Sequence, residues 1–188
     1  MNRVVAGWEV PTSWFQSVNP GFILLLGGLF AALWVRLAKV NREPSTPVKF
    51  GLGIIQLGLG YAALYYGAIT HDGGMVGLLW LVLGYLLHTT GELCLSPVGL
   101  SMITKLSPGS IVGLMMGFWF LAIAYAQYIA AQIAKLTGVA EGGEQLVLTD
   151  TVVVYGSVYG KLALLAIGVG LVTLIISPLL RRGMKGVH

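Results

Sequence analysis

Charged side chains are scarce in this chain. Only 10% of its 188 residues are Asp, Glu, Lys or Arg, whereas 56% are hydrophobic. Soluble domains carry about 25% charged residues, so this composition excludes an ordinary soluble protein. The net charge of +4 comes from basic residues scattered at the ends of apolar runs. That distribution is not typical of a nucleic-acid-binding protein, and we expect no nucleic acid among its partners.

Cysteine and metal-ligand clusters are also lacking. Cys94 is the single cysteine, so no disulfide can form within one chain, and cysteine use says nothing about the redox compartment. His88 and Glu92 lie one helical turn apart, but no third or fourth ligand accompanies them. We therefore expect no metal site and no cofactor.

Long apolar runs predict an all-α membrane protein that forms a single domain over residues 1–188. The expected spans lie near 20–38, 50–70, 75–104, 111–134 and 154–180. A span needs about 20 mostly apolar residues, and each run meets or nearly meets that length. Pro97 gives the long third span a reason to bend. The longest connection, 137–150, is Gly-rich and acidic.

Basic residues orient these spans, because short loops rich in Lys and Arg stay in the cytoplasm. Three lie on one side of the predicted membrane: Arg3, Lys135 and Lys161. Eight lie on the other: Arg36, Lys39, Arg42, Lys49, Lys105, Arg181, Arg182 and Lys185. We expect a multi-pass protein of the cell membrane with a cytoplasmic C-terminus, and with the N-terminus, residues 71–74 and the acidic loop outside.

Residues 1–19 do not resemble a signal peptide, because no basic segment is followed by an apolar one. Trp8, Pro11, Trp14 and Phe15 are instead typical of an interfacial segment that leads into a helix. An odd number of spans behind an exterior N-terminus suggests that the chain continues a larger membrane protein. The alternative is a complete five-span protein whose short N-terminus is drawn across by the first helix.

Small residues recur at helical spacing in several spans, where they allow close helix packing. Gly113 and Gly117 form one GxxxG pair, and Gly156 and Gly160 form another. The fourth span also carries an alanine ladder, and the second span carries four glycines: Ala122, Ala126, Ala130 and Ala134, and Gly51, Gly53, Gly58 and Gly60. We expect a compact bundle, with Gly117 against another helix.

Glu92 is the only acidic residue between Met75 and Leu106. A charged side chain at the centre of a bilayer costs about 2.5 kcal/mol or more, so one that is present usually meets a partner, a substrate or a proton path. It belongs to a polar stripe at spacings of three and four: Tyr85, His88, Thr89, Glu92 and Ser96. A structural Glu that bonds a neighbouring helix is the alternative, and for His88 simple packing is favoured over a proton relay.

Three further residues are ambiguous from pattern alone. Trp119 and Phe120 lie among methionines and another phenylalanine, which is equally typical of a packed or lipid-facing surface. Asn19 precedes Pro20 at the start of the first span, which favours a helix cap over a ligand contact.

Three segments resemble the C-terminal part of a proton-dependent oligopeptide transporter (POT) of the major facilitator superfamily. WFQSVNPGFILLLGGLFAALW (14–34) is similar to the start of that family's helix 8, and STPVKFGLG (45–53) to its entry into helix 9. GELCLSPVGLSMITKLSPGSIVGLMMGFWFLAIA (91–124) resembles helices 10 and 11 and is the most specific match. The resemblance implies helices 8–12 of the family's C-terminal six-helix bundle.

The resemblance also implies roles in a proton-coupled di- or tripeptide symporter. Glu92 would engage the peptide's amino terminus, or a lysine of the other bundle, and take part in proton coupling. Ser96 would line the same cavity, Asn19 would contact the peptide backbone, and Trp119 and Phe120 would form walls of a side-chain pocket. The implied partners are small peptides, protons, the lipid bilayer and the missing N-terminal helices of the same transporter, whose ExxERFxYY motif is absent here.

Two other functions remain open from the residues themselves. A membrane scaffold or accessory subunit would use Glu92 only to pair with a partner helix. An intramembrane enzyme with His88 and Glu92 as an acid–base pair is disfavoured, because no nucleophile or metal set accompanies them. We expect a secondary active transporter segment rather than an enzyme.

Overall fold

Five long helices make up the computed structural model, which describes residues 4–5, 7–71, 75–137 and 148–184. These helices are α1 (Val18–Lys39), α2 (Thr46–Ile69), α3 (Leu78–Leu106), α4 (Val112–Thr137) and α5 (Leu148–Gly183). Each contains a segment that is long and apolar enough to cross a membrane. The five predicted spans and the all-α membrane fold are therefore confirmed.

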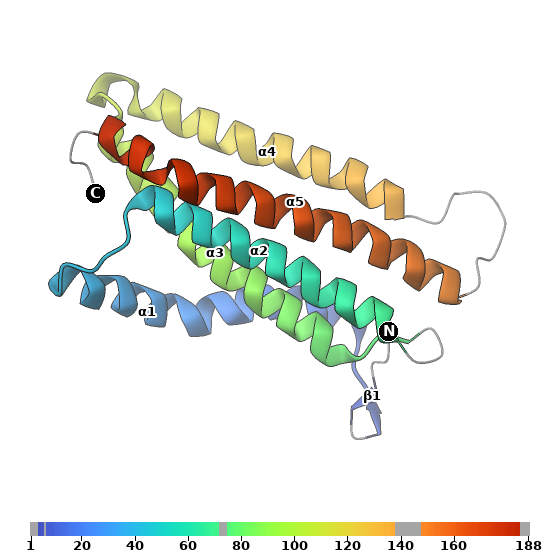
Figure 1. The fold of residues 1–188 in the computed structure, drawn as a ribbon. Coiled ribbons are helices and arrows are strands. Elements are labelled where there is room, and N and C mark those ends of the chain that lie inside the picture. The colour runs from blue at the N-terminus through green and yellow to red at the C-terminus, as the bar shows by residue number, and fades with distance from the viewer. Residues whose placement is uncertain (1–3, 6, 72–74, 138–147, 185–188) are drawn as a thin grey trace.

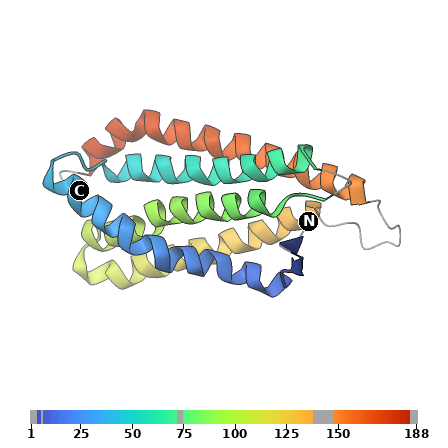
Figure 2. The same ribbon diagram turned by 90° about the horizontal axis from the view of Figure 1, so that it is seen from below.

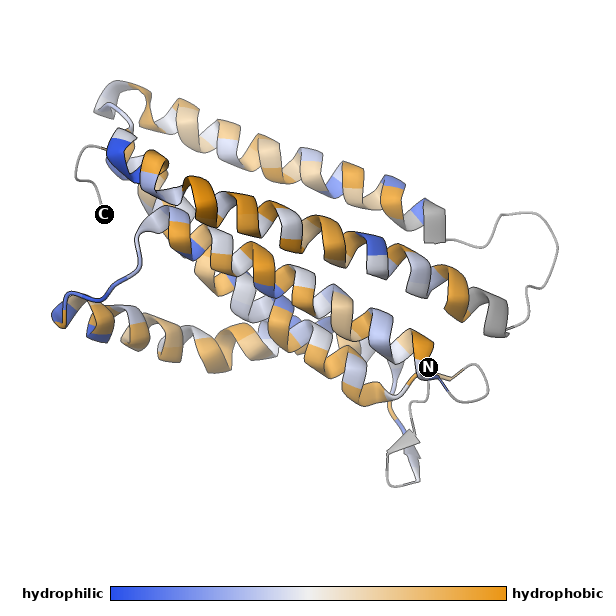
Figure 3. Cartoon of the chain, viewed as in Figure 1, coloured by the Kyte–Doolittle hydropathy of each residue, from blue (hydrophilic) through white to orange (hydrophobic). Residues whose placement is uncertain are grey.

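Hydropathy and helix formation go together because a bilayer offers the backbone no water with which to form hydrogen bonds. Figure 3 shows apolar residues along all five helices, whereas hydrophilic residues gather where α1 connects to α2. Helix α1 ends there through Asn41, which has a φ of 54°. The Asn41 N–H bonds the Ala38 carbonyl, and the Arg42 N–H bonds the Leu37 carbonyl. This arrangement satisfies the last carbonyls of the helix before the chain turns.

Helix α2 lies between α3 and α5, and these three helices form the tightly packed part of the molecule (Figures 1 and 2). Glycines make the packing possible. A Cβ at Gly53 would lie 2.8 Å from the Gly91 carbonyl oxygen of α3, and one at Gly58 would lie 2.9 Å from the Ile167 nitrogen of α5. The predicted role of the second-span glycines is confirmed. Gly156 and Gly160 likewise face α2.

Helices α1 and α4 flank α3 and are only loosely attached (Figures 1 and 2). Neither carries a buried residue among those whose burial is described. The expectation that Gly117 lies against another helix is wrong for this chain, because a Cβ there, or at Gly113, would meet nothing within 4 Å. Three alanines of the small-residue ladder on α4 are exposed as well: Ala122, Ala126 and Ala130.

The segment before α1 is more structured than the sequence predicted. Two-residue strands β1 (Val4–Val5) and β2 (Trp8–Glu9) pair antiparallel, and a 3-10 turn, η1 (Thr12–Ser17), leads into α1. The rings of Trp8 and Trp14 meet edge to face at 5.2 Å. A second 3-10 turn, η2 (Gly109–Ile111), precedes α4. The predicted turn at 72–74 and most of the acidic connection, 138–147, lie outside the described residues.

Candidate functional site

Helix α3 presents Glu92 away from its tightest neighbour. Gly91 lies against the Gly53 backbone of α2, with 2.7 Å between its would-be Cβ and the Gly53 carbonyl oxygen. The following side chain, Glu92, is therefore turned out of the α2–α3 contact, and both it and Ser96 are exposed. Residues 92 and 96 are one turn apart and share a face of the helix, as the spacing predicted.

Asn19 comes to Glu92 from the first turn of α1. Its Nδ2 donates a hydrogen bond to Glu92 Oε2 at 3.2 Å. Helix α1 already begins at Val18, with Ser17 at the cap position, so the interpretation of Asn19 as a helix cap is wrong. The 3-10 turn before α1 moves the helix start upstream and leaves the Asn19 amide available to α3.

The amide oxygen of Asn19 is a second feature of this pair. Because an ionised carboxylate only accepts hydrogen bonds, the amide must direct its nitrogen to Glu92, which fixes its orientation. Asn19 Oδ1 is then buried and has no hydrogen-bond partner in the part of the chain that the structure describes. Asn19 and Glu92 together provide a neutral and an anionic acceptor side by side.

Trp119 of α4 contacts α3 about two helical turns beyond Glu92. A Cβ at Gly99 would lie 2.5 Å from Trp119 Cη2 and 3.0 Å from Phe50 Cζ. Gly99 follows Glu92 by seven residues and Ser96 by three, so it lies on their side of α3. Four of the predicted site residues, Asn19, Glu92, Ser96 and Trp119, are thus placed along α3 by three helices.

Phe120 is not brought into this group. Its side chain is 57% exposed, and it follows Trp119 by one residue, which turns it about 100° around α4. The α4 atoms nearest to the Cβ position of Gly99 belong to the neighbouring Trp119.

The predicted polar stripe divides into two surfaces. Thr89 is fully buried, and its hydroxyl donates to the Tyr85 carbonyl at 2.7 Å. His88 is directed into α2, where its ring fills the space beside Gly60 and meets the Tyr61 ring at a centroid distance of 4.7 Å. His88 thus packs away from Glu92, which agrees with a packing role and gives no geometric support to an acid–base pair.

No cluster of three His, Cys, Asp or Glu side chains that could hold a metal ion occurs within 4–5, 7–71, 75–137 and 148–184. Cys94 is buried, and Gln56 Nε2 lies 3.7 Å from its sulfur. The cysteine therefore belongs to the contact between α2 and α3.

Lys49 is a polar residue whose placement the sequence did not reveal. It counted only as a basic residue flanking the first loop, yet it is 6% exposed. Its Nζ lies 2.5 Å from Glu43 Oε1 and 4.5 Å from the centre of the Trp34 ring. The sequence contains both partners close by, with Glu43 in the loop before Lys49 and Trp34 in the preceding helix, but it does not show that they meet.

The family of this chain follows from comparison with known proteins. The sequence model described as the POT family matches residues 1–148. The chain belongs to the POT family. Within that family it is 43% identical over 183 residues to YclF, a transporter of Bacillus subtilis strain 168, and 42% identical over 130 residues to a di-/tripeptide transporter of Lactococcus lactis subsp. cremoris.

These alignments cover 97% and 69% of this POT-family chain, but only 34% and 26% of the two relatives. The chain thus spans between about a quarter and two fifths of the length of the curated relatives it matches. Among solved structures, a peptide transporter in complex with alafosfalin superposes with a TM-score of 0.82 at 39% identity, over 98% of this chain and 35% of the other. The five helices are therefore a part of the POT-type fold, and the chain is a multi-pass membrane protein.

Proposed function

We propose that this chain is the C-terminal, peptide-binding part of a proton-coupled di- and tripeptide symporter. The observation that carries the proposal is the pair of acceptors on α1 and α3. Glu92 supplies a negative charge, and Asn19 Oδ1 supplies a buried acceptor without a partner among the described residues. A peptide ammonium has three donors and one positive charge, which matches this arrangement.

The remaining roles follow from position along α3. Ser96 adds a hydroxyl one turn from Glu92, and Trp119 forms an aromatic wall near Gly99. Phe120 is proposed as a second wall, which requires helices beyond those in this chain. Family relatives named as di-/tripeptide transporters support the substrate class.

Proton coupling is assigned to Glu92 because it is the only carboxylate in α3. Transport would proceed by the rocking of two helical repeats about a midplane site, as in related folds. The chain would then act together with further helices of the same transporter, in the cell membrane, with a cytoplasmic C-terminus.

Uptake of a labelled dipeptide into proteoliposomes that contain the complete transporter tests the proposal. We expect accumulation when the outside is more acidic than the inside, and only equilibration without the gradient. An excess of unlabelled dipeptide should abolish the signal, whereas its N-acetylated form should not, because acetylation removes the ammonium. Equal competition by the acetylated dipeptide would contradict recognition of the ammonium.

A membrane scaffold or accessory subunit is the second candidate, because Glu92 already has a partner, Asn19, within its own chain. A scaffold would give no dipeptide uptake with or without the gradient. Loss of Glu92 would then lower the stability of the assembly while leaving no transport to affect.

A further inference from the structure

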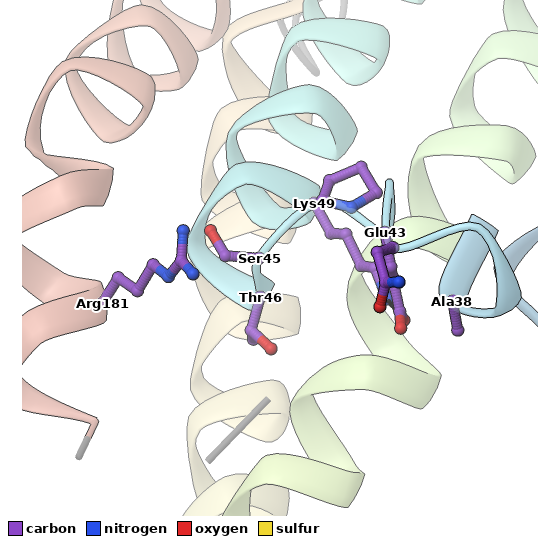
Figure 4. A pocket seen from close by; sticks show the side chains of 8 residues that line it. Ala38, Glu43, Ser45, Thr46, Lys49 and Arg181 are labelled. Carbon is purple, nitrogen blue, oxygen red and sulfur yellow. Dashed lines mark hydrogen bonds and ion pairs between the residues drawn. The ribbon is translucent and has the colours of Figure 1, made fainter. Parts of the chain in front are cut away.

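A polar cavity lies where the connection from α1 to α2 meets the end of α5, and Glu92 does not line it. Its volume is about 280 Å³. Figure 4 shows the Arg181 guanidinium of α5 directed toward Ser45 and Thr46, with Lys49 and Glu43 on the far side. The polar lining consists of Asn41, Glu43, Ser45, Thr46, Lys49 and Arg181.

Three charged side chains line this cavity, and two of them form an ion pair with each other. Glu43 and Lys49 neutralise one another across 2.5 Å, and Lys49 also lies over the Trp34 ring. Arg181 has neither an ion pair nor a hydrogen bond to any other described side chain, and the hydroxyls of Ser45 and Thr46 are likewise unpaired there. The cavity thus keeps one uncompensated positive charge and two hydroxyl donors, which is the donor set of an anion site.

The position of the cavity narrows the choice of anion. The residues that line the cavity come from the α1–α2 connection, the ends of α1 and α5 and the start of α2, and Glu92 is not among them. The cavity lies at the polar ends of two apolar helices, the level at which lipid headgroups meet a membrane protein. A guanidinium pairs with phosphate oxygens through two parallel hydrogen bonds.

We propose that this cavity binds a phosphate group through Arg181, Ser45 and Thr46. The group is carried by the headgroup of an anionic phospholipid or is free phosphate. An occupied site would connect the α1–α2 connection to the end of α5, two segments far apart in the sequence. The proposal does not depend on peptide transport, since none of its residues belongs to the Glu92 site.

Ligand binding to the complete transporter, purified in detergent, provides the test. The unfolding temperature is followed while dihexanoyl phosphatidylglycerol, dihexanoyl phosphatidylcholine or inorganic phosphate is added. We expect phosphatidylglycerol to bind better than phosphatidylcholine. Arg181→Gln should weaken that binding by at least about tenfold, because it removes the positive charge and the paired hydrogen bonds of the guanidinium. Arg182→Gln is the matched control, because Arg182 is the next residue of α5 and does not line the cavity.

The three ligands separate the sources of the phosphate. Binding of phosphatidylglycerol alone, with loss in Arg181→Gln only, supports a lipid headgroup. Binding of inorganic phosphate with the same dependence on Arg181 supports a free-anion site. The proposal is overturned if no ligand binds, if both arginine variants weaken binding equally, or if phosphatidylcholine binds as well as phosphatidylglycerol.

Discussion

Asn19 and Glu92 connect the first turn of α1 to the middle of α3 through one hydrogen bond of 3.2 Å. That bond fixes the orientation of the Asn19 amide and leaves its oxygen next to the carboxylate. This bond joins two helices that have fewer contacts with each other than α2 has with α3 or α5. Residues in direct contact affect each other's energetic contribution, and this gives a measurable consequence.

A double-mutant cycle on dipeptide affinity tests the pair. We expect Asn19→Ala and Glu92→Gln each to weaken binding, and the double variant to lose less than the sum by about 0.5 kcal/mol or more. Asn19→Ala combined with Phe120→Ala is the control, because α4, which carries Phe120, has no contact with α1, which carries Asn19, in the described part of the chain. That control should be additive, and additive behaviour in the Asn19–Glu92 cycle as well would show that the two residues do not act together.

Single residues were the hardest part to predict from the sequence. The Asn-Pro pair indicated a cap at Asn19, but an upstream 3-10 turn started the helix earlier. His88 and Glu92 share a helical spacing, yet they face different surroundings because Gly60 of α2 leaves room for the imidazole. The sequence could identify Glu92 as exceptional, but it could not show which neighbouring helix would approach it.

At the scale of whole helices, glycines decide which helices pack closely. Gly170 of α5 faces α2, where a Cβ would lie 2.6 Å from Ile55 Cγ1 and 3.0 Å from the Gly51 carbonyl oxygen. Gly168, two residues earlier on the same helix, would place its Cβ in open space. Replacing each glycine by alanine therefore separates the effect of close packing on stability from the effect of helix propensity.

Thermal unfolding of Gly170→Ala and Gly168→Ala measures this difference. Alanine favours the helix equally at both positions, by about 1 kcal/mol. At Gly170 the added methyl group must push against backbone atoms, and overpacking of this kind costs about 1–3 kcal/mol. We expect Gly168→Ala to be neutral or stabilising and Gly170→Ala to be less stable. Equal unfolding temperatures would contradict the close contact between α2 and α5.

The helices themselves were predictable, because about 20 apolar residues in a row have few other stable arrangements. Which helices pack against one another was only partly predictable. The glycines of α2 pack as expected, whereas Gly113 and Gly117 of α4 face open space in this chain. A small residue shows that a close approach is possible, but the sequence does not say which helix makes it. The two-residue strands of the N-terminal hairpin are too short to give a periodic signal.

For the whole molecule, the distribution of basic residues predicts the direction of every span. The α1–α2 and α3–α4 connections should be cytoplasmic, and the α2–α3 connection should be outside. Ser107→Cys and Thr70→Cys, each in a Cys94→Ala background, place one thiol at each end of the bundle. A membrane-impermeant maleimide added to intact cells should label position 70 and not position 107. The reverse pattern would invert the topology.

We propose that Glu92 binds the peptide ammonium and takes part in proton coupling. The most direct test is to compare, in the complete transporter, dipeptide accumulation driven by a proton gradient with dipeptide exchange in the absence of a gradient. Glu92→Gln keeps the shape and removes the charge, so it should weaken peptide binding by about 1.5–3 kcal/mol and reduce accumulation more than exchange. Glu92→Asp, which keeps the charge, should retain part of both. If Glu92→Gln accumulates dipeptide against a gradient as well as the unaltered transporter does, Glu92 is a structural residue and has neither of the two proposed roles.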